Sequence, residues 1–474
     1  MVHHTPETKW FRVLFLLVIT YVEEFPMRAS HSLSLTEGPM LPAIIRFSIP
    51  LMLSNVLQVL FNMSDIAVVG RFAGARALGA VGSTTILVTL FTGFLIGMGS
   101  GVNVVTARYL GAGRHRDVSM TVHTSAILLL ITGALLLAFG FLFTPALLQL
   151  LGTKEELLSG AIRYLRIYLL GMPALAVFNF GNGVLSASGD TRHPLLFLSI
   201  AGVLNVILNL LFVIVFHMAE AGVALASALS QYVSAGLIVL SLARRPESIG
   251  LHRAQLRLDP FKCRQVLGIS IPSGLQNAIF AIANLFIQAG VNTFDAVMVE
   301  GNAAAANADA LVYDVMAAVY LACSSFMSQN YGGRHRQRVK KSYVLCLGLS
   351  FGIAAVMSAF LVIFGREFLG LFTKEPEVVE AGLTRLQVMG CSYAFSALMD
   401  CTIAASRGLG RSLAPTVIVI LGSCVFRVIW VYTVFAHFHA ILSLYLLYIF
   451  SWAITGIAEL IYFFHCYRER MREI

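Results

Sequence analysis

Twelve long apolar runs constrain this chain more than any other feature of its sequence. A helix needs about 20 apolar residues to cross the ~30 Å hydrocarbon core of a bilayer, because each residue adds about 1.5 Å. The runs reach that length and are rich in Leu, Ala and Ile, without the alternation of β-strands. With 58% hydrophobic and 12% charged residues, the sequence predicts an all-α membrane protein with twelve transmembrane helices. The predicted spans are 43–66, 77–105, 120–147, 157–187, 194–216, 221–243, 264–292, 303–328, 341–364, 379–405, 414–436 and 440–465.

The second half of the chain repeats the first. The tripeptide Ser-Ile-Pro at 48–50 returns at 270–272, and Asn55 returns as Asn277, both at an offset of 222 residues. Six spans in each half give the two repeats the same orientation, so a pseudo-two-fold axis along the membrane normal should relate two six-helix lobes. The predicted organisation is an N-terminal tail at 1–40, an N-lobe at 41–243, a cytoplasmic linker at 244–262 and a C-lobe with a short basic tail at 263–474.

Lys and Arg are concentrated on one side of the predicted topology. The connections after even-numbered spans and the C-terminal tail carry about twenty of them, and the connections after odd-numbered spans carry about five. The positive-inside rule therefore predicts a multi-pass protein of the plasma (inner) membrane with both termini in the cytoplasm. These loops also account for the net charge of +9, so the charge does not indicate a nucleic-acid partner.

The N-terminal tail has three interpretations. Its apolar run at 10–22 has 13 residues and is too short to span a bilayer. An over-extended gene start, with Met27 or Met40 as the natural first residue, would explain it. An interfacial helix or a cleaved signal peptide would explain it as well.

The sequence lacks the motifs of soluble catalysis. It contains no P-loop and no HExxH, and its seven cysteines form no CxxC pair, so they are interpreted as small packing residues. We therefore do not expect an enzyme. No cofactor is expected, and no metal beyond Na⁺ at the ion site described next. The expected partners are small-molecule substrates and membrane lipid, and the expected state is a monomer.

The first half carries one clear carboxylate among amide and hydroxyl side chains within its spans. An ionisable group in a membrane helix is costly and is therefore a functional candidate. Carboxylate, amide and hydroxyl oxygens together could replace the hydration shell of a small cation. The alternatives are an interfacial carboxylate that reaches water, and asparagines that only join helices by hydrogen bonds. The predicted ion-coupling set is Asp65, Asn179, Asn182, Asn205, Asn209 and Ser227.

The second half has a polar set of its own. Arg427 lies in mid-span, where an isolated guanidinium is costly, so Asp400 or Glu459 is expected to pair with it. Either a structural ion pair or a substrate-facing role would explain this arginine. The candidate C-lobe polar site is Gln276, Asn277, Asp309, Asp314, Asp400 and Arg427.

Several short motifs, taken in order and on the expected spans, resemble the MATE (multidrug and toxic compound extrusion) family. The resemblance runs from about residue 35 to the C-terminus. The motifs are Ser-Ile-Pro-Leu at 48–51, Ser-Asp-Ile-Ala-Val-Val-Gly-Arg at 64–71, Gly-Asp-Thr-Arg at 189–192, Ser-Gln-Asn-Tyr-Gly at 328–332 and Arg-Gly-Leu-Gly at 407–410.

The resemblance implies a secondary active exporter with two lobes around a central cavity, which expels cationic or amphipathic compounds in exchange for Na⁺ or H⁺. In one branch of the family an N-lobe ion site matches the predicted set around Asp65. Asn209 stands where that branch has a carboxylate, so Asp65 should be the main titrating group. A second branch uses a glutamate on the seventh helix, and this chain has no acid within that span; Asp400 lies about one turn from that branch's aspartate.

Two other functions are alternatives to drug export. A flippase for lipid-linked oligosaccharides or other lipids can share this architecture, but it would be expected to have a more basic central cavity. A membrane enzyme or receptor is disfavoured by the repeat and by the missing catalytic motifs. Basic side chains on the cavity wall therefore distinguish an exporter from a flippase.

Overall fold

The computed structural model describes residues 33–246 and 248–474, and every regular element in that part of the chain is helical. The interpretations of the tail at 1–32 lie outside the described residues. The N-lobe helices are α2 (Met40–Val68), α3 (Gly74–Gly111), α4 (His115–Leu150), α5 (Glu155–Leu169), α6 (Met172–Ala187), α7 (Arg192–Leu210) and α8 (Ala219–Ala243). The C-lobe helices are α9 (Pro260–Val291), α10 (Ala296–Gly332), α11 (Arg336–Ile363), α12 (Gly365–Leu369), α13 (Pro376–Gly408), α14 (Leu413–Val419), α15 (Phe426–Trp430), α16 (Ala436–Phe438) and α17 (Ile441–Glu473).

The twelve predicted crossings are all present in this part of the chain. Ten continuous helical segments are long and apolar enough to span a bilayer, and the bent pair α5–α6 makes eleven. The segment Met40–Gly111 has 72 residues, far more than one ~30 Å crossing needs. It reverses at Gly74, whose φ of 87° is accessible to glycine without strain. Counting α2 and α3 separately gives twelve.

Several spans are bent or locally unwound. The fourth predicted span is two helices, α5 and α6, that meet at 44°. Pro173 lies in the first turn of α6, where a missing backbone N–H removes no helical hydrogen bond. Wider π-helical turns follow α2 at Val69–Ala73 and α7 at Leu211–Val215, and two more flank α15 at Ile420–Val425 and Val431–Phe435. Such turns often mark functional positions in helices.

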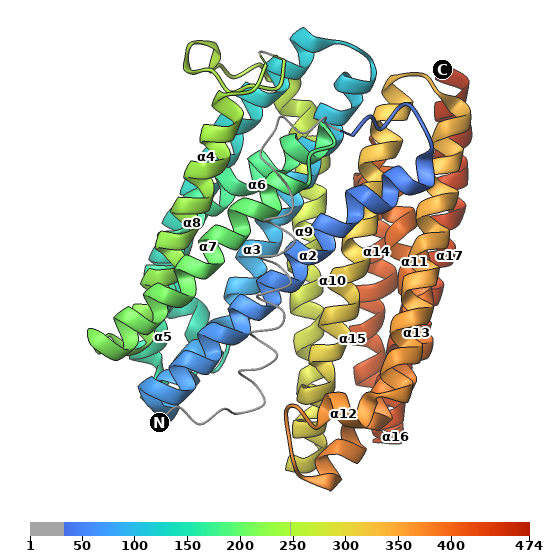
Figure 1. The fold of residues 1–474 in the computed structure, drawn as a ribbon. Helices are drawn as coiled ribbons and strands as arrows, with labels where there is room; N and C mark the ends of the chain where they lie inside the picture. The colour runs from blue at the N-terminus through green and yellow to red at the C-terminus, as the bar shows by residue number, and fades with distance from the viewer. Residues whose placement is uncertain (1–32, 247) are drawn as a thin grey trace. The chain divides into compact units, whose positions relative to one another are not determined.

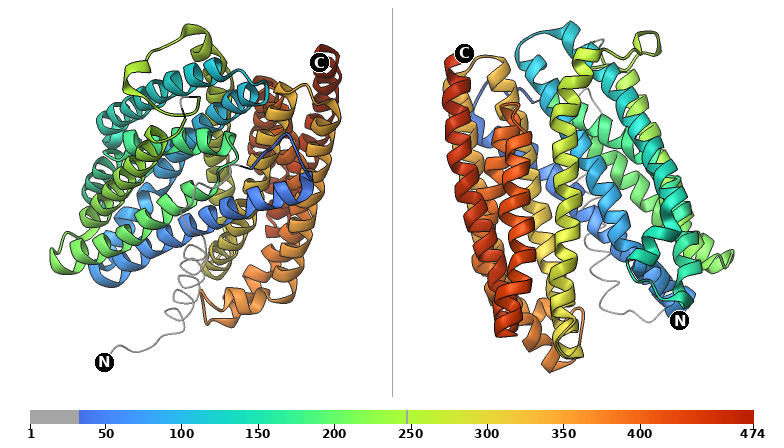
Figure 2. Two further views of the ribbon diagram at one scale, coloured as in Figure 1. Left: turned by 45° about the horizontal axis from the view of Figure 1, so that its top comes forward. Right: turned by 180° about the vertical axis from the view of Figure 1, so that it is seen from behind.

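The two lobes meet along four helices, α2 and α3 of the first repeat and their equivalents α9 and α10 of the second, and α3 also packs against α10. α3 packs against α9 and α2 packs against α10; Figure 1 shows the second pair, and Figure 2 (right) shows α9 along the boundary. The amide of Asn55 on α2 donates to the Asp314 carbonyl at 2.7 Å, and its repeat equivalent Asn277 on α9 donates to the Gly93 carbonyl at 2.9 Å. The same contact is thus made twice, as the predicted pseudo-two-fold axis requires.

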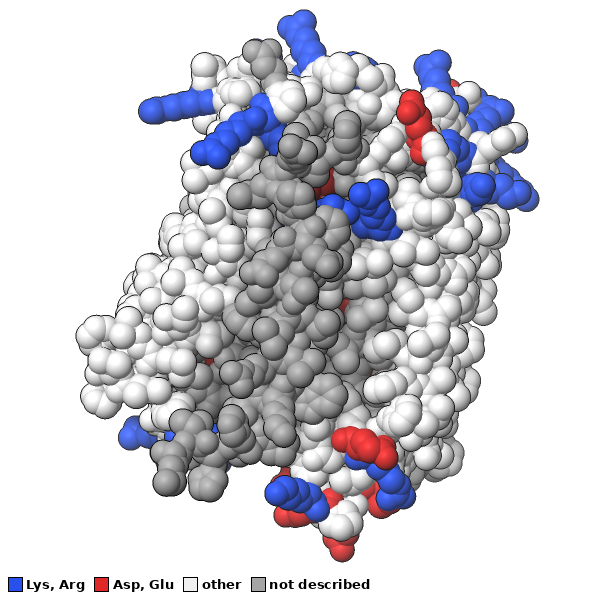
Figure 3. Space-filling view, viewed as in Figure 1, with Lys and Arg blue, Asp and Glu red and all other residues white. Residues whose placement is uncertain are grey.

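One end of the described structure is basic and is closed between the lobes. On the face drawn in Figure 3, Lys and Arg gather at the end where the C-terminus lies, and the sides of the helices are nearly free of charge. Near this basic end, Ser325 Oγ donates to Asn103 Oδ1 at 2.9 Å and Gln329 Nε2 donates to the Ala187 carbonyl at 2.6 Å. Asn103 and Ser325 are themselves 222 residues apart, so equivalent positions of the repeat touch across the axis.

The connection between the lobes is anchored to the N-lobe. α9 begins at Pro260, inside the stretch predicted as linker, because Asp259 caps it by accepting the Lys262 amide at 2.9 Å. The Lys262 ammonium is buried, bonds Asp117 of α4 at 2.7 Å and lies 3.6 Å from the centre of the Tyr109 ring. The first turn of the C-lobe is therefore held by N-lobe side chains.

Candidate functional site

Four of the six predicted ion-coupling residues form one closed hydrogen-bond ring in the N-lobe. Asn209 Nδ2 donates to Asp65 Oδ1 at 2.5 Å, and Ser227 Oγ donates to Asp65 Oδ2 at 3.1 Å. Asn205 Nδ2 donates to Ser227 Oγ at 3.2 Å, and Asn209 Nδ2 also donates to Asn205 Oδ1 at 3.1 Å. We call Asp65, Asn205, Asn209 and Ser227 the Asp65 ring.

The local helix geometry explains how these side chains meet. Asn205 and Asn209 are four residues apart on α7 and therefore share a face, while Asp65 and Ser227 come from α2 and α8. π-helical turns begin four residues after Asp65 and two after Asn209. An apolar cluster contains Val68, three residues after Asp65, together with Tyr164, and Tyr168 packs against it. The ring is thus a polar group within a largely apolar lobe.

The Asp65 ring presents oxygen atoms suited to a small cation. The carboxylate, two amide oxygens and one hydroxyl are hard ligands of the kind that Na⁺ and Ca²⁺ take. Asn209 Oδ1 is buried and has no hydrogen-bond partner among the described atoms, which leaves one acceptor beside Asp65 free to bind an ion. A proton on Asp65 would neutralise the same charge.

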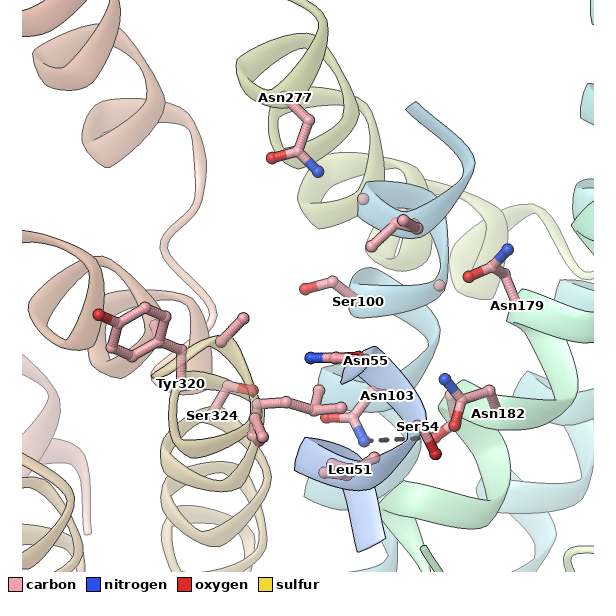
Figure 4. Close-up of a pocket in the computed structure, with 18 of the residues that line it drawn as sticks. Leu51, Ser54, Asn55, Ser100, Asn103, Asn179, Asn182, Asn277, Tyr320 and Ser324 are labelled. Atoms are coloured by element: carbon pink, nitrogen blue, oxygen red, sulfur yellow. Dashed lines mark hydrogen bonds between the residues drawn. The ribbon is translucent and has the colours of Figure 1, made fainter. Parts of the chain in front are cut away.

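Asn179 and Asn182 are brought to a different place. Asn179 Nδ2 donates to the Leu175 carbonyl of its own helix at 2.9 Å, and Asn182 Oδ1 accepts from Ser186 at 3.3 Å. Neither has a hydrogen bond to the Asp65 ring in the described structure. Both line a cavity of about 350 Å³ between the lobes, opposite Tyr320 of α10 (Figure 4). Their spacing on one helix predicted that Asn179 and Asn182 lie on the same face, but it did not predict which other helices that face would meet.

The cavity between the lobes carries much of the predicted C-lobe polar set. Gln276, Asn277, Asp314 and Asp400 all line it. Arg407, which belongs to the motif at 407–410 but not to the predicted polar set, lines it too and donates to Gln276 Oε1 at 2.7 Å. Arg407 lies just past the predicted end of its span, where an arginine is ordinarily interpreted as a loop residue.

A second cavity of about 540 Å³ shares Asn277, Tyr313, Asp314 and Asp400 with the first and extends into the C-lobe. Asp309 on its wall is paired with Arg385, which donates to one carboxylate oxygen at 2.9 and 2.6 Å; Tyr393 donates to the other. Arg385 also lies within a predicted span and is 6% exposed. The argument used for Arg427, that a guanidinium within a span is costly, would also have identified Arg385.

The ion pair predicted for Arg427 is wrong. Within the described structure neither Asp400 nor Glu459 lies within 4.0 Å of its guanidinium. Arg427 instead donates to Asn284 at 3.2 Å and to Ser451 at 3.3 Å. Aromatic faces around it supply electrostatic stabilisation that the prediction left out.

Glu459 is buried completely on α17. Neither carboxylate oxygen has a hydrogen-bond partner among the described atoms. Burial of a carboxylate without a hydrogen-bond partner is costly, so Glu459 is an unusual feature of this helix. Asp400, in contrast, accepts from Ser396 Oγ at 3.0 Å and faces both cavities.

Comparison with known proteins agrees with this architecture. The family profile described as MatE matches residues 50–211 and 272–433, one match in each repeat. A solved structure titled as the outward-facing conformation of a multidrug resistance MATE family transporter of the MOP superfamily has a TM-score of 0.86 at 22% identity. It covers 94% of this chain and 100% of that chain.

Curated relatives give the same family. The probable multidrug resistance protein YpnP of Bacillus subtilis is 30% identical over 373 residues, which cover 76% of this chain and 80% of that protein. A protein of Shewanella oneidensis named FAD transporter is 26% identical over 77% of this chain and 81% of its own length. With the profile matched in both repeats and the twelve-helix, two-lobe fold, this chain belongs to the MATE family of multidrug efflux transporters.

Proposed function

We propose that this protein is a secondary active exporter that exchanges cationic or amphipathic small molecules for Na⁺ or H⁺. It acts as a monomer in the plasma (inner) membrane, with the basic end and both termini in the cytoplasm. One relative is named FAD transporter, so the proposal also includes substrates other than drugs. The observation that carries the proposal is the Asp65 ring: one carboxylate held by a hydroxyl and an amide from two other helices.

Coupling follows from the charge on Asp65. Outside the cell, Na⁺ or H⁺ binds and neutralises the carboxylate, which favours release of the substrate. The ion leaves on the cytoplasmic side, and a potential of 100 mV supplies ~2.3 kcal/mol for each charge moved. The ion must bind the two conformations with different affinity, because a ligand with equal affinity for both shifts nothing.

The cavity walls favour an exporter over a lipid flippase. The acidic and basic side chains that line the two cavities are three aspartates and three arginines: Asp309, Asp314, Asp400, Arg385, Arg407 and Arg427. A site for a lipid pyrophosphate would be expected to carry an excess of positive charge. The described cavities carry none, so drug export is the function proposed.

Transport in liposomes with separately imposed gradients tests this proposal. Purified protein is reconstituted, and efflux of a cationic dye is driven by a Na⁺ gradient alone or by a pH gradient alone. Asp65→Asn should abolish gradient-driven transport, while Glu377→Gln, the same change at an exposed acid, should leave it intact. Asn209→Asp adds a second carboxylate and should strengthen the dependence on Na⁺. Full gradient-driven activity of Asp65→Asn would refute the coupling scheme.

A further inference from the structure

The linker between the two lobes, with the first turn of α9, leaves large apolar side chains uncovered. Leu256 is 43% exposed, Leu258 49% and Phe261 63%. Figure 1 draws the linker as a yellow-green loop at the basic end of the molecule. Apolar side chains that gather uncovered in one short segment are typical of a surface that contacts a membrane or another molecule.

Arginines alternate with these apolar side chains. Arg253, Arg257 and Arg264 are all exposed, and none of them forms an ion pair with another described residue. Lys262, in the same stretch, is buried against Asp117 instead. We call residues 253–264 the linker anchor. Basic residues beside Leu and Phe are the composition of segments that lie in the interface of a bilayer.

Hydrogen bonds fix the linker anchor along α4. The Thr124 hydroxyl donates to the Arg257 carbonyl at 3.3 Å and accepts from the Asp259 amide at 3.2 Å. One residue before the anchor, the His252 amide donates to Nε2 of His123 at 3.0 Å. The backbone is therefore held against the N-lobe, and the exposed side chains are turned away from it.

The position of Thr124 in α4 places the linker anchor at the surface of the bilayer. α4 has 36 residues and is therefore ~54 Å long, so it extends beyond the ~30 Å hydrocarbon core. Thr124 is nine residues after His115, the first residue of the helix, which is ~14 Å along the helix axis. The uncharged apolar part of α4 begins two residues later, at Ala126. The backbone of the anchor thus lies where headgroups meet the hydrocarbon core.

We infer that the linker anchor docks on anionic phospholipids, with its arginines on the phosphates and its apolar side chains inserted below them. Arginine suits this role because its planar fork can donate two hydrogen bonds to one phosphate. Leu and Phe at this depth enter the boundary between headgroups and acyl chains by about 5–10 Å. With the proposed orientation, the leaflet is the cytoplasmic one, which carries the negative surface potential.

Two quencher lipids that differ only in their headgroup test the inference. A fluorophore is attached at Ala254→Cys, an exposed position of the anchor, after Cys263 and Cys391 are replaced by Ser. The full chain is placed in phosphatidylcholine nanodiscs that contain increasing fractions of acyl-chain nitroxide lipid, either phosphatidylglycerol or phosphatidylcholine. Each arginine near an anionic surface is worth about fivefold in affinity. Half-maximal quenching should therefore need about tenfold less of the phosphatidylglycerol probe, and 1 M salt should remove most of this difference.

Variants of the anchor separate its charge from its apolar side chains. The triple change of Arg253, Arg257 and Arg264 to Gln should make the two probes quench equally, because only the charge distinguishes them. Replacing both Leu256 and Leu258 by Asn should weaken quenching by both probes alike, because the segment then lies further from the acyl chains.

The matched control removes the same charge elsewhere at the basic end. Arg336, Lys340 and Lys341 are exposed on α11, and their triple change to Gln should leave the lipid preference at the anchor within about twofold of its original value. Because all of the substituted side chains in the charge variants are exposed, neither variant should lower the melting temperature measurably. The salt series on the unsubstituted anchor gives a result that does not depend on any of these variants.

Four results would overturn the inference. Equal quenching by the two probes at low salt would show that the anchor has no preference for anionic lipid, and a preference that survives the Arg→Gln anchor variant would place it elsewhere. Equal loss in the α11 control would reduce it to the net charge of the basic end. Quenching by neither probe would show that water or another protein covers the segment. Both leaflets of a nanodisc carry the same lipid and no transport is measured, so failure of the proposed export function or orientation would not affect these outcomes.

Discussion

The closed basic end offers a direct test of how the lobes alternate. Gln329 of α10 donates to the Ala187 carbonyl at 2.6 Å. Ala187 is the last residue of α6, so its carbonyl has no partner within that helix. Gln329 therefore caps an N-lobe helix from the C-lobe, and the contact must break whenever the basic end opens.

The size of the effect follows from this geometry. Gln329→Ala leaves a buried carbonyl unsatisfied in the closed state, at a cost of ~1–3 kcal/mol. Water can reach the same carbonyl once the end opens, so the open state does not carry this cost. The equilibrium should shift toward the open state by about 5-fold to 150-fold.

This shift can be measured as a distance distribution by pulsed electron paramagnetic resonance. Spin labels are attached at Arg116→Cys and Arg336→Cys, two exposed positions of the basic end. Cys263 and Cys391 are replaced by Ser beforehand, because the other five cysteines are buried. Gln329→Ala should increase the population of long distances. Thr132→Val, which removes a hydroxyl bonded only within α4, is the matched control. An unchanged distance distribution, or a shorter one, would show that this contact does not hold the end closed.

Two further predictions concern buried charges. Arg385→Gln should destabilise the protein by ~3–5 kcal/mol, because it leaves the Asp309 carboxylate, which is only 16% exposed, without its cation. The double variant Arg385→Met with Asp309→Leu should recover much of that loss. Thermal unfolding in detergent measures both, and a single variant as stable as wild type would contradict the reasoning. At the turn between α6 and α7, burial raises the pKa of Asp190, but the hydrogen bond from His193 and the charges of His193 and Arg245 outweigh it and lower the pKa below the ordinary 3.8. The ionised carboxylate therefore contributes stability that is complete above 3.8 and is lost as the pH falls through the lower folded value. Asp190→Asn should lower the melting temperature at pH 7, and its difference from wild type should shrink only below about pH 3.8; a difference independent of pH would contradict this.

Sequence periodicity predicted the fold of this protein almost completely. Three features of the sequence carried this prediction: the apolar runs, the offset of 222 residues and the distribution of Lys and Arg. They are local or additive properties, so they do not depend on which helices pack against each other. For the same reason Asp65 could be identified from sequence: a carboxylate within an apolar run is conspicuous wherever its helix lies.

The packing of the helices decided which groups the polar side chains contact. Spacing along a helix shows that Asn179 and Asn182 share a face, but the rotation of α6 turns that face to the cavity between the lobes instead of the Asp65 ring. An ion pair depends on distances of a few ångströms between helices far apart in the chain. That is why Arg385 has a carboxylate partner and Arg427 has none. The sequence by itself determined which charged residues lie within the apolar spans; only the tertiary structure decided which of them have a partner of opposite charge among the described residues, because that depends on how helices far apart in the chain pack together.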